Sequence, residues 1–343
     1  MTGGVTGRVI RFGAGALADL GAVAAEVGLL RPMLVTTRRG AVAATGLPVV
    51  GSFDGVCPHV PVETVREAAS LARELDADGL VALGGGSAVD TAKAVVAELL
   101  PEVQLRVVAV PTTYAGAEWT PYFGVLLAPG RKGGGSDARA RPVAAIYDPE
   151  LTLGLSVADT VGTAMNALAH CAEAYYHPAT SDEAARNADA GATAIGTALP
   201  RVVERPGALD ARSLLLKGAM HAALALDASG LCLGHAMAQG LGGRYGLPQG
   251  TMNALCLSPA LRFNAVAAPD AVARLGRALD AGDAAGRVEE LAALGGFGRL
   301  RDHGVPWDDL PDVAVEIAAR AGAKANPRPA GPGEIAELLR AIW

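Results

Sequence analysis

The sequence predicts two domains: an α/β domain with a parallel sheet, followed by a domain made of helices. Three observations predict this fold class. Short β-branched runs alternate with Ala- and Leu-rich stretches in the first half, strand-like runs stop after Asp148-Pro149, and 343 residues are enough for two domains. Because Asp-Pro interrupts a helix, we place the boundary near residues 147–155 and predict domains of residues 1–155 and 156–343.

Five segments of the first domain have the length and composition of buried strands. Two stretches between them, residues 17–28 and 62–76, have charged residues at helical spacing. Strands that alternate with helices form βαβ units, in which neighbouring strands are parallel. The predicted strands are residues 8–12 (RVIRF), 32–37 (PMLVTT), 79–85 (GLVALGG), 106–113 (RVVAVPTT) and 143–148 (VAAIYD).

From residue 157 to residue 343, Ala-rich amphipathic segments separated by Gly and Pro predict helices. Hydrophobic residues make up 51% of the chain and charged residues 19%, so both domains can bury a large core. The net charge of -6 argues against a nucleic-acid partner, which requires a basic face.

Four widely spaced cysteines form no CxxC pair, which argues against a structural zinc site and favours free thiols in a reducing compartment. The N-terminus has no signal-peptide pattern, and the apolar runs are shorter than the ~20 residues that a bilayer requires. We therefore predict a cytoplasmic protein without a membrane partner. The cysteines are Cys57, Cys171, Cys232 and Cys256.

The strongest local motif is GGGSAVDTAK, residues 84–93, which follows an apolar run and opens an Ala-rich helix. A strand, a glycine loop and a helix together present backbone N–H groups and a positive helix end to an anion. The motif is neither GxGxxG nor the Walker pattern. We predict that Gly84, Gly85, Gly86 and Ser87 of this Rossmann-like unit bind the phosphate of a ligand. A plain turn from strand to helix is the competing interpretation.

Two further strand ends carry candidate cofactor residues. Thr112 and Thr113 lie at the end of the segment 106–113, after RVVAV, and can donate hydroxyl hydrogen bonds to phosphate or ribose, although this end could equally be an ordinary loop. Thr36 and Arg38 lie at the end of the second strand, which contacts the ribose in doubly wound folds. Arg38 and Arg39 without an acid favour a 2′-phosphate and hence NADPH, whereas solvated surface arginines are the alternative.

Two of the six histidines are paired with amides at helical spacing. Asn166 and His170 are four residues apart, as are His235 and Gln239, so each pair shares one face of a helix. On spacing alone, both pairs could be ordinary polar groups on packed helices.

Several motifs together identify a family. GGGSAVDTAK resembles the GGGSxxDxAK cofactor loop of iron-containing alcohol dehydrogenases, and VPTTYAGAEWTPYFGV at residues 110–125 is similar to a segment of their maleylacetate reductase branch. Other similar segments extend the resemblance over essentially the whole chain: RFGAGALADL, HVPVETV, YDPELTLGL, NPRP and LLRAIW. The resemblance implies the dehydroquinate synthase-like architecture of that superfamily, NADH or NADPH as cofactor, a small-molecule substrate and a homodimer.

The resemblance also locates the metal-ligand positions of metal-using members. They fall on Asn166, His170, His235 and Gln249, and a further family histidine falls on Gln239. Two imidazoles and two neutral amides supply no anionic ligand to a divalent ion. We therefore predict that no tightly bound metal takes part.

The resemblance predicts an NAD(P)H-dependent reductase that transfers hydride to a conjugated enone or ketone, as in the reduction of maleylacetate to 3-oxoadipate. His170 and His235 would donate hydrogen bonds and protons, assisted by Tyr114 and Asn166. Arg244, Arg139 or Arg141 could bind substrate carboxylates. The alternatives are a metal-dependent alcohol or aldehyde dehydrogenase, a non-redox enzyme of cyclisation or elimination on the same fold, and a non-catalytic binding protein.

Overall fold

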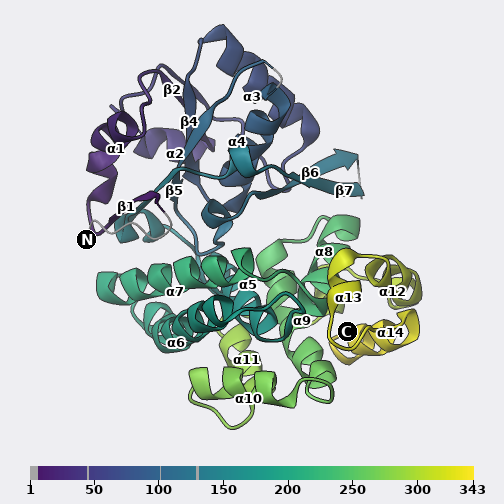
Figure 1. Ribbon diagram of the computed structural model, residues 1–343. Helices are drawn as coiled ribbons and strands as arrows, with labels where there is room; N and C mark the ends of the chain where they lie inside the picture. Colours follow the sequence, from purple (N-terminus) through teal and green to yellow (C-terminus); the bar gives the residue numbers. More distant parts are fainter. Residues whose placement is uncertain (1–6, 45, 101, 129–130) are drawn as a thin grey trace. The chain divides into compact units, whose positions relative to one another are not determined.

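The computed structural model describes residues 7–343 except residues 45, 101 and 129–130. The chain divides into two compact units, Met1–Leu153 and Gly154–Trp343. All described strands lie in the first unit, and the described elements of the second are helices (Figure 1). The predicted fold class, an α/β part followed by a helical part, is confirmed.

The first unit is built on a parallel sheet. Its described residues form six strands in the order β1-β8-β5-β4-β2-β3, and each neighbouring pair is parallel. Five of these strands match the predicted segments, whereas the three-residue edge strand β3 is too short to show a pattern in the sequence. The strands are β1 (Val9–Phe12), β2 (Pro32–Thr36), β3 (Gly51–Phe53), β4 (Gly79–Gly84), β5 (Arg106–Pro111) and β8 (Ala144–Tyr147).

Helices cover both faces of this sheet, because successive strand residues point to opposite faces. On β4, Leu80 and Ala82 join one core with helices α3 and α4, while Val81 and Leu83 join another core with α1. Each fully buried leucine or valine stabilises the fold by roughly 1.5–3 kcal/mol. The helices are α1 (Leu20–Glu26), α2 (Arg38–Ala43), α3 (Val62–Glu74) and α4 (Gly86–Leu99).

An antiparallel hairpin, β6 (Tyr122–Ala128) and β7 (Arg131–Ser136), was not predicted, because RKGGGS has no β-branched residue. Lys93 of α4 holds the segment before it. The Lys93 side chain is fully buried, and its Nζ donates to the carbonyls of Ala117 (2.8 Å) and Tyr122 and pairs with Asp90 (3.1 Å). The lysine of the glycine-loop motif thus links α4 to the hairpin.

A buried carboxylate lies in the same segment. Glu118 is 3% exposed and accepts a hydrogen bond from the Tyr147 hydroxyl at 2.7 Å, which in turn accepts one from the Trp119 indole at 2.5 Å. Burial raises the pKa of the Glu118 carboxyl, and the Tyr147 hydrogen bond and the charges of Lys93 and Arg8 oppose this rise. Ionised Glu118 is therefore more costly in the folded chain than in the unfolded chain.

The Glu118→Gln variant is expected to gain stability over the wild type as the pH rises. Because the pKa is raised on folding, the folded state binds more protons, and stability falls as the pH rises through the folded-state pKa. Glutamine keeps an acceptor oxygen for Tyr147 but has no charge to ionise. Each 1 kcal/mol gained would raise the Tm by roughly 2–4 °C. Melting curves at pH 5 and pH 8 test this, with the exposed Glu98→Gln as control; a Tm difference that shrinks towards pH 8 would contradict it.

The second unit is a bundle of helices, and two of the described helices begin with a serine cap. Ser156 accepts a hydrogen bond from the Asp159 amide at 3.0 Å, and Ser181 accepts one from the Ala184 amide at 3.1 Å. One core joins α8 and α9 to α12, α13 and α14. The helices are α5 (Val157–Tyr176), α6 (Asp182–Glu204), α7 (Leu209–Asp227), α8 (Leu233–Tyr245), α9 (Gln249–Asn264), α10 (Pro269–Ala278), α11 (Ala284–Ala293), α12 (Leu310–Ala318), α13 (Ala321–Ala325) and α14 (Pro332–Ala341). Among the described residues, no helix has both the length and the apolar character needed to cross a bilayer.

Candidate functional site

The two loops predicted to bind a cofactor lie side by side, because β4 and β5 are neighbours in the sheet. The Thr112 amide donates to the Gly84 carbonyl at 2.9 Å. Gly84 has φ +155°, and a Cβ on Gly85 would lie 2.9 Å from Cγ2 of Thr113, so neither position accommodates a side chain without a shift. The chain runs outward from β2 to β3 but in the opposite direction from β4 to β5. In doubly wound folds, ligands bind in the crevice outside the strand ends where this direction changes.

The first turn of α4 supplies backbone donors at the same place. Gly85 is its N-cap, and the first intrahelical bonds come from the amides of Ala88 and Val89 to the Gly85 carbonyl. The earlier amides of Gly86 and Ser87 have no partner within the helix and can face an anion. The structure therefore confirms a strand, a glycine loop and a helix start in this order, and anion binding there stays a prediction.

Thr36 and Arg38 occupy different environments at the end of β2. The Thr36 side chain is fully buried, and its hydroxyl donates to the Leu83 carbonyl of β4 at 2.7 Å. This bond joins two strand ends, so Thr36 shapes the crevice and does not offer its hydroxyl proton to a ribose. Arg38 is exposed at the start of α2, where Thr37 is the N-cap.

In the helical unit, three helices bring the predicted catalytic residues together. A close backbone approach joins α5 to α9: a Cβ on Gly250 would lie 2.5 Å from the carbonyl carbon of Gly162. One turn further along α5, Asn166 accepts a hydrogen bond from Asn253 Nδ2 at 2.6 Å. With its oxygen held by Asn253, Asn166 presents its Nδ2 to Nε2 of His170, 3.5 Å away.

His170 of α5 and His235 of α8 stack on each other. Their ring centroids are 4.7 Å apart, and their planes differ by 8°. Burial, and then the neighbouring His235, lower the pKa of His170 well below its usual value, so His170 is neutral at neutral pH. Nδ1 of His170 and Nε2 of His235 are buried and have no hydrogen-bond partner among the described residues. These two nitrogens are free to bind a ligand atom.

Sequence reasoning missed Glu173, which contacts His235 directly. Glu173 lies on α5 three residues after His170, has no exposed surface, and its Oε2 is 2.8 Å from Nδ1 of His235. A signal was present: Glu173 is the only charged side chain between Asp159 and Asp182 in an Ala-rich sequence. A lone carboxylate in an apolar helix requires buried partners.

The Tyr114 hydroxyl, which was predicted to assist as a hydrogen-bond donor, makes a hydrogen bond within the protein. Tyr114 is fully buried, and its hydroxyl donates to Thr152 at 3.1 Å, while Thr152 donates its own proton to the Pro149 carbonyl at 2.8 Å. The hydroxyl proton of Tyr114 is therefore used in a chain of hydrogen bonds that connects this residue to residues 149–152.

The arginines predicted to bind carboxylates are already engaged. Arg244 pairs with Glu316 at 2.6 Å, Arg139 pairs with Asp137 at 2.8 Å, and Arg141 donates to the Trp119 carbonyl at 3.0 Å. A substrate would have to displace these partners.

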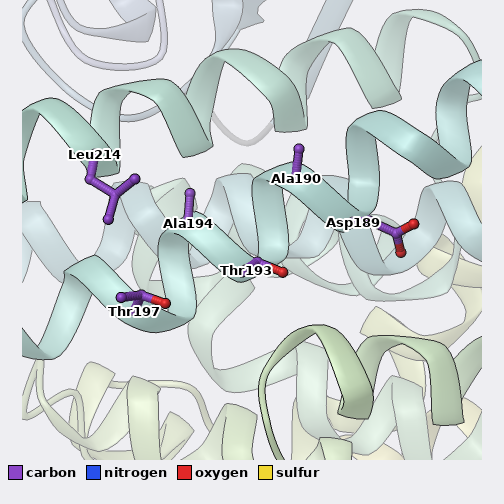
Figure 2. Close-up of a pocket in the computed structure, with 6 residues that line it drawn as sticks. All are labelled: Asp189, Ala190, Thr193, Ala194, Thr197 and Leu214. Atoms are coloured by element: carbon purple, nitrogen blue, oxygen red, sulfur yellow. The ribbon is translucent and has the colours of Figure 1, made fainter.

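A shallow pocket on α6 lies outside this site. Figure 2 shows that Leu214 of α7 faces a row of α6 side chains there. Its one carboxylate, Asp189, is held by Arg274 at 2.6 Å and by the Tyr175 hydroxyl at 2.9 Å. The pocket therefore presents small side chains and a neutralised acid, without a group suited to catalysis. The α6 residues are Asp189, Ala190, Thr193, Ala194 and Thr197.

Family models and curated relatives match nearly the whole chain. Residues 7–149 match the family described as iron-containing alcohol dehydrogenase, and residues 160–343 match the C-terminal part of the Fe-containing alcohol dehydrogenase family. Maleylacetate reductase of Burkholderia cepacia is 37% identical over 335 residues, which cover 96% of this chain and 93% of that protein. Maleylacetate reductase of Sphingobium indicum is 37% identical over 338 residues, with coverage of 97% and 94%.

Solved structures give the same result. A putative alcohol dehydrogenase from Ralstonia eutropha JMP134 has a TM-score of 0.92 and 36% identity, covering 100% of this chain and 97% of its own. Maleylacetate reductase from Rhizobium sp. strain MTP-10005 has a TM-score of 0.89 and 32% identity, with the same coverage.

Proposed function

Because the chain belongs to the iron-containing alcohol dehydrogenase family, we propose that it is an NAD(P)H-dependent reductase of the maleylacetate reductase type, which adds hydride to a conjugated enone or ketone. The observation that carries the proposal is the stacked pair His170 and His235, whose two buried nitrogens have no partner among the described residues. Loss of absorbance at 340 nm on addition of maleylacetate to enzyme and NADH or NADPH tests it. No loss with either cofactor would overturn it.

The glycine loop fits a nicotinamide dinucleotide. Gly84, Gly85 and the first amides of α4 form a cradle that a Cβ would fill, and Thr112 and Thr113 border it. Exposed Arg38 suits the 2′-phosphate of NADPH. When bound, the nicotinamide supplies the hydride.

Hydride addition moves electron density to the carbonyl oxygen of the substrate, and hydrogen-bond donors there lower the barrier. Because Asn166 Nδ2 faces Nε2 of neutral His170, the ring proton belongs on Nδ1, the nitrogen without a partner. His170 can then donate to the developing oxyanion without charge. His235 can supply the proton that the resulting enolate requires: its imidazolium form gives the Nε2 proton to the enolate carbon and becomes a neutral ring that keeps the proton on Nδ1.

The residues at the family's metal positions do not fit a metal ion. Asn166 Oδ1, the atom best suited to a hard cation, already accepts from Asn253, and an ion bound by both histidines would have to lie in the planes of two stacked rings. Among the described residues, no group of three or more His, Cys, Asp or Glu is arranged to hold a metal. We therefore propose catalysis by side chains alone.

Removal of metal is expected to leave the reduction rate unchanged. The enzyme would be dialysed against EDTA, its metal content measured by mass spectrometry, and its kcat compared before and after dialysis. A stoichiometric bound ion, or activity that falls with EDTA and returns with added Fe²⁺ or Zn²⁺, would contradict metal independence.

Arg320 is the candidate partner for a substrate carboxylate. Its Nε is buried and has no hydrogen-bond partner among the described residues. The side chain lies against α8, 3.7 Å from where a Cβ of Gly240 would be, and Gly240 is five residues after His235. Arg320 therefore lies against the same helix that carries His235.

Arg320→Ala is expected to raise KM for maleylacetate about 10- to 150-fold, because a hydrogen bond to a charged group contributes about 1.5–3 kcal/mol. Steady-state kinetics measure this, with Arg287→Ala, a surface arginine paired with Glu290, as control. An unchanged KM would exclude Arg320 from substrate binding.

A further inference from the structure

Glu173 is a buried carboxylate that three N–H groups surround. The Cys232 amide donates to Oε2 at 2.7 Å, the His235 amide donates to Oε1 at 3.0 Å, and the His235 ring contacts Oε2 at 2.8 Å. A Cβ on Gly234 would lie 3.0 Å from Oε1, so glycine at 234 leaves room for the carboxylate. All three donors belong to the start of α8, although Glu173 lies on α5.

This arrangement replaces an ordinary helix cap. Cys232 is the N-cap residue of α8, and its side chain makes no cap hydrogen bond. Glu173 instead satisfies amides of the first turn from another helix, where the positive helix end favours an anion. The helix start and the imidazole one turn inside it are therefore held by the same carboxylate.

The contact also determines where the proton of the His235 ring lies. A carboxylate only accepts hydrogen bonds, so Nδ1 of His235 must carry a proton. Nε2 is then the nitrogen that faces the ligand space, and it is buried without a partner among the described residues. To donate a proton, the ring must also carry one on Nε2, and loss of that proton leaves a neutral ring protonated on Nδ1 alone.

We propose that Glu173 is a positioning residue that fixes His235 with Nδ1 protonated and directs Nε2 to the substrate. The tautomer follows from the contacts of Glu173 alone; the effect on turnover rests on the proposed reductase function. Glu173 does not touch the reacting atoms and acts only through His235.

Nitrogen-15 NMR of histidine-labelled enzyme tests the tautomer directly, because long-range correlations distinguish protonated from unprotonated ring nitrogens. The signals of His235 are assigned by their loss in His235→Gln. We expect Nδ1 of His235 to be protonated in the wild-type enzyme and the other tautomer to appear in Glu173→Leu, which has no oxygen to accept from Nδ1. An unprotonated Nδ1 in the wild type overturns the proposal, and this measurement requires no Glu173 variant to fold. An identical His235 spectrum in a folded Glu173→Leu also overturns it.

Turnover gives the second measurement. Glu173→Gln is expected to lower kcat about 10- to 100-fold, the range for losing a carboxylate behind a functional histidine, and leave KM for the nicotinamide cofactor unchanged. Asp189→Asn is the matched control, because Asp189 is also a carboxylate that accepts a hydrogen bond from α5, at Tyr175. Equal kcat values for Glu173→Gln and wild type would overturn the positioning role. If the wild type reduces no enone, the reductase function fails, while the NMR result still decides the tautomer.

Discussion

Replacing His235 with alanine is expected to lower kcat for maleylacetate about 10²- to 10⁴-fold, the usual effect of losing a positioned general acid. The loss should be this large because the ring is buried, stacked on His170 and held by Glu173, so water cannot take its place in the same orientation. Stopped-flow or steady-state loss of NAD(P)H absorbance measures the rate.

His221→Ala provides the control for this experiment. His221 is a partly buried histidine of the same unit, 3.0 Å from Asn187, and contacts neither catalytic ring in the proposed mechanism. His170→Ala should lower kcat as well, since it removes the neutral donor. An undiminished rate in His235→Ala would exclude the general-acid role and favour another chemistry on this fold.

The second large effect is expected at the glycine loop. Gly85→Val is expected to weaken NADH and NADPH binding about 5- to 150-fold, because overpacking of a close contact costs typically 1–3 kcal/mol. The added side chain would meet Thr113 and separate the two loops that border the crevice. Isothermal titration calorimetry with each cofactor gives the Kd.

Gly333→Ala is the matched control, because a Cβ at that position meets no atom within 4 Å. The thermal melting of Gly85→Val should be compared with that of the control, so that loss of folding is separated from loss of binding. Wild-type affinity in a folded Gly85→Val would show that the cofactor does not use this loop.

The sheet was predictable from the sequence because its central strands are buried on both faces and consist of β-branched runs, as in VVAV at residues 107–110. The hairpin β6–β7 was not, because its strands are glycine-rich and it is held by Lys93, a contact that depends on tertiary structure. Local patterns do not encode such a contact.

In the candidate site, too, local spacing predicted some contacts but not those between residues far apart in the sequence. Spacing placed Asn166 and His170 on one helical face, and the structure confirms that they face each other. The burial of Tyr114 against Thr152 and the reach of Glu173 to His235 join residues 38 and 62 positions apart. Such long-range hydrogen bonds decide which polar groups remain available for chemistry, and periodicity does not report them.

The burial of Lys93 has a consequence for ionic strength. Its ammonium group is enclosed by Asp90 and backbone carbonyls, so under the proposed function the glycine loop would attract phosphate through peptide dipoles at short range. Dissolved ions screen exposed charges beyond about 8–10 Å and have little influence on such enclosed contacts. Added salt should therefore affect the binding of NADH and NADPH differently. The affinity for the pyrophosphate that both share should change little, whereas any additional affinity for the 2′-phosphate of NADPH through exposed Arg38 should decrease as salt is added.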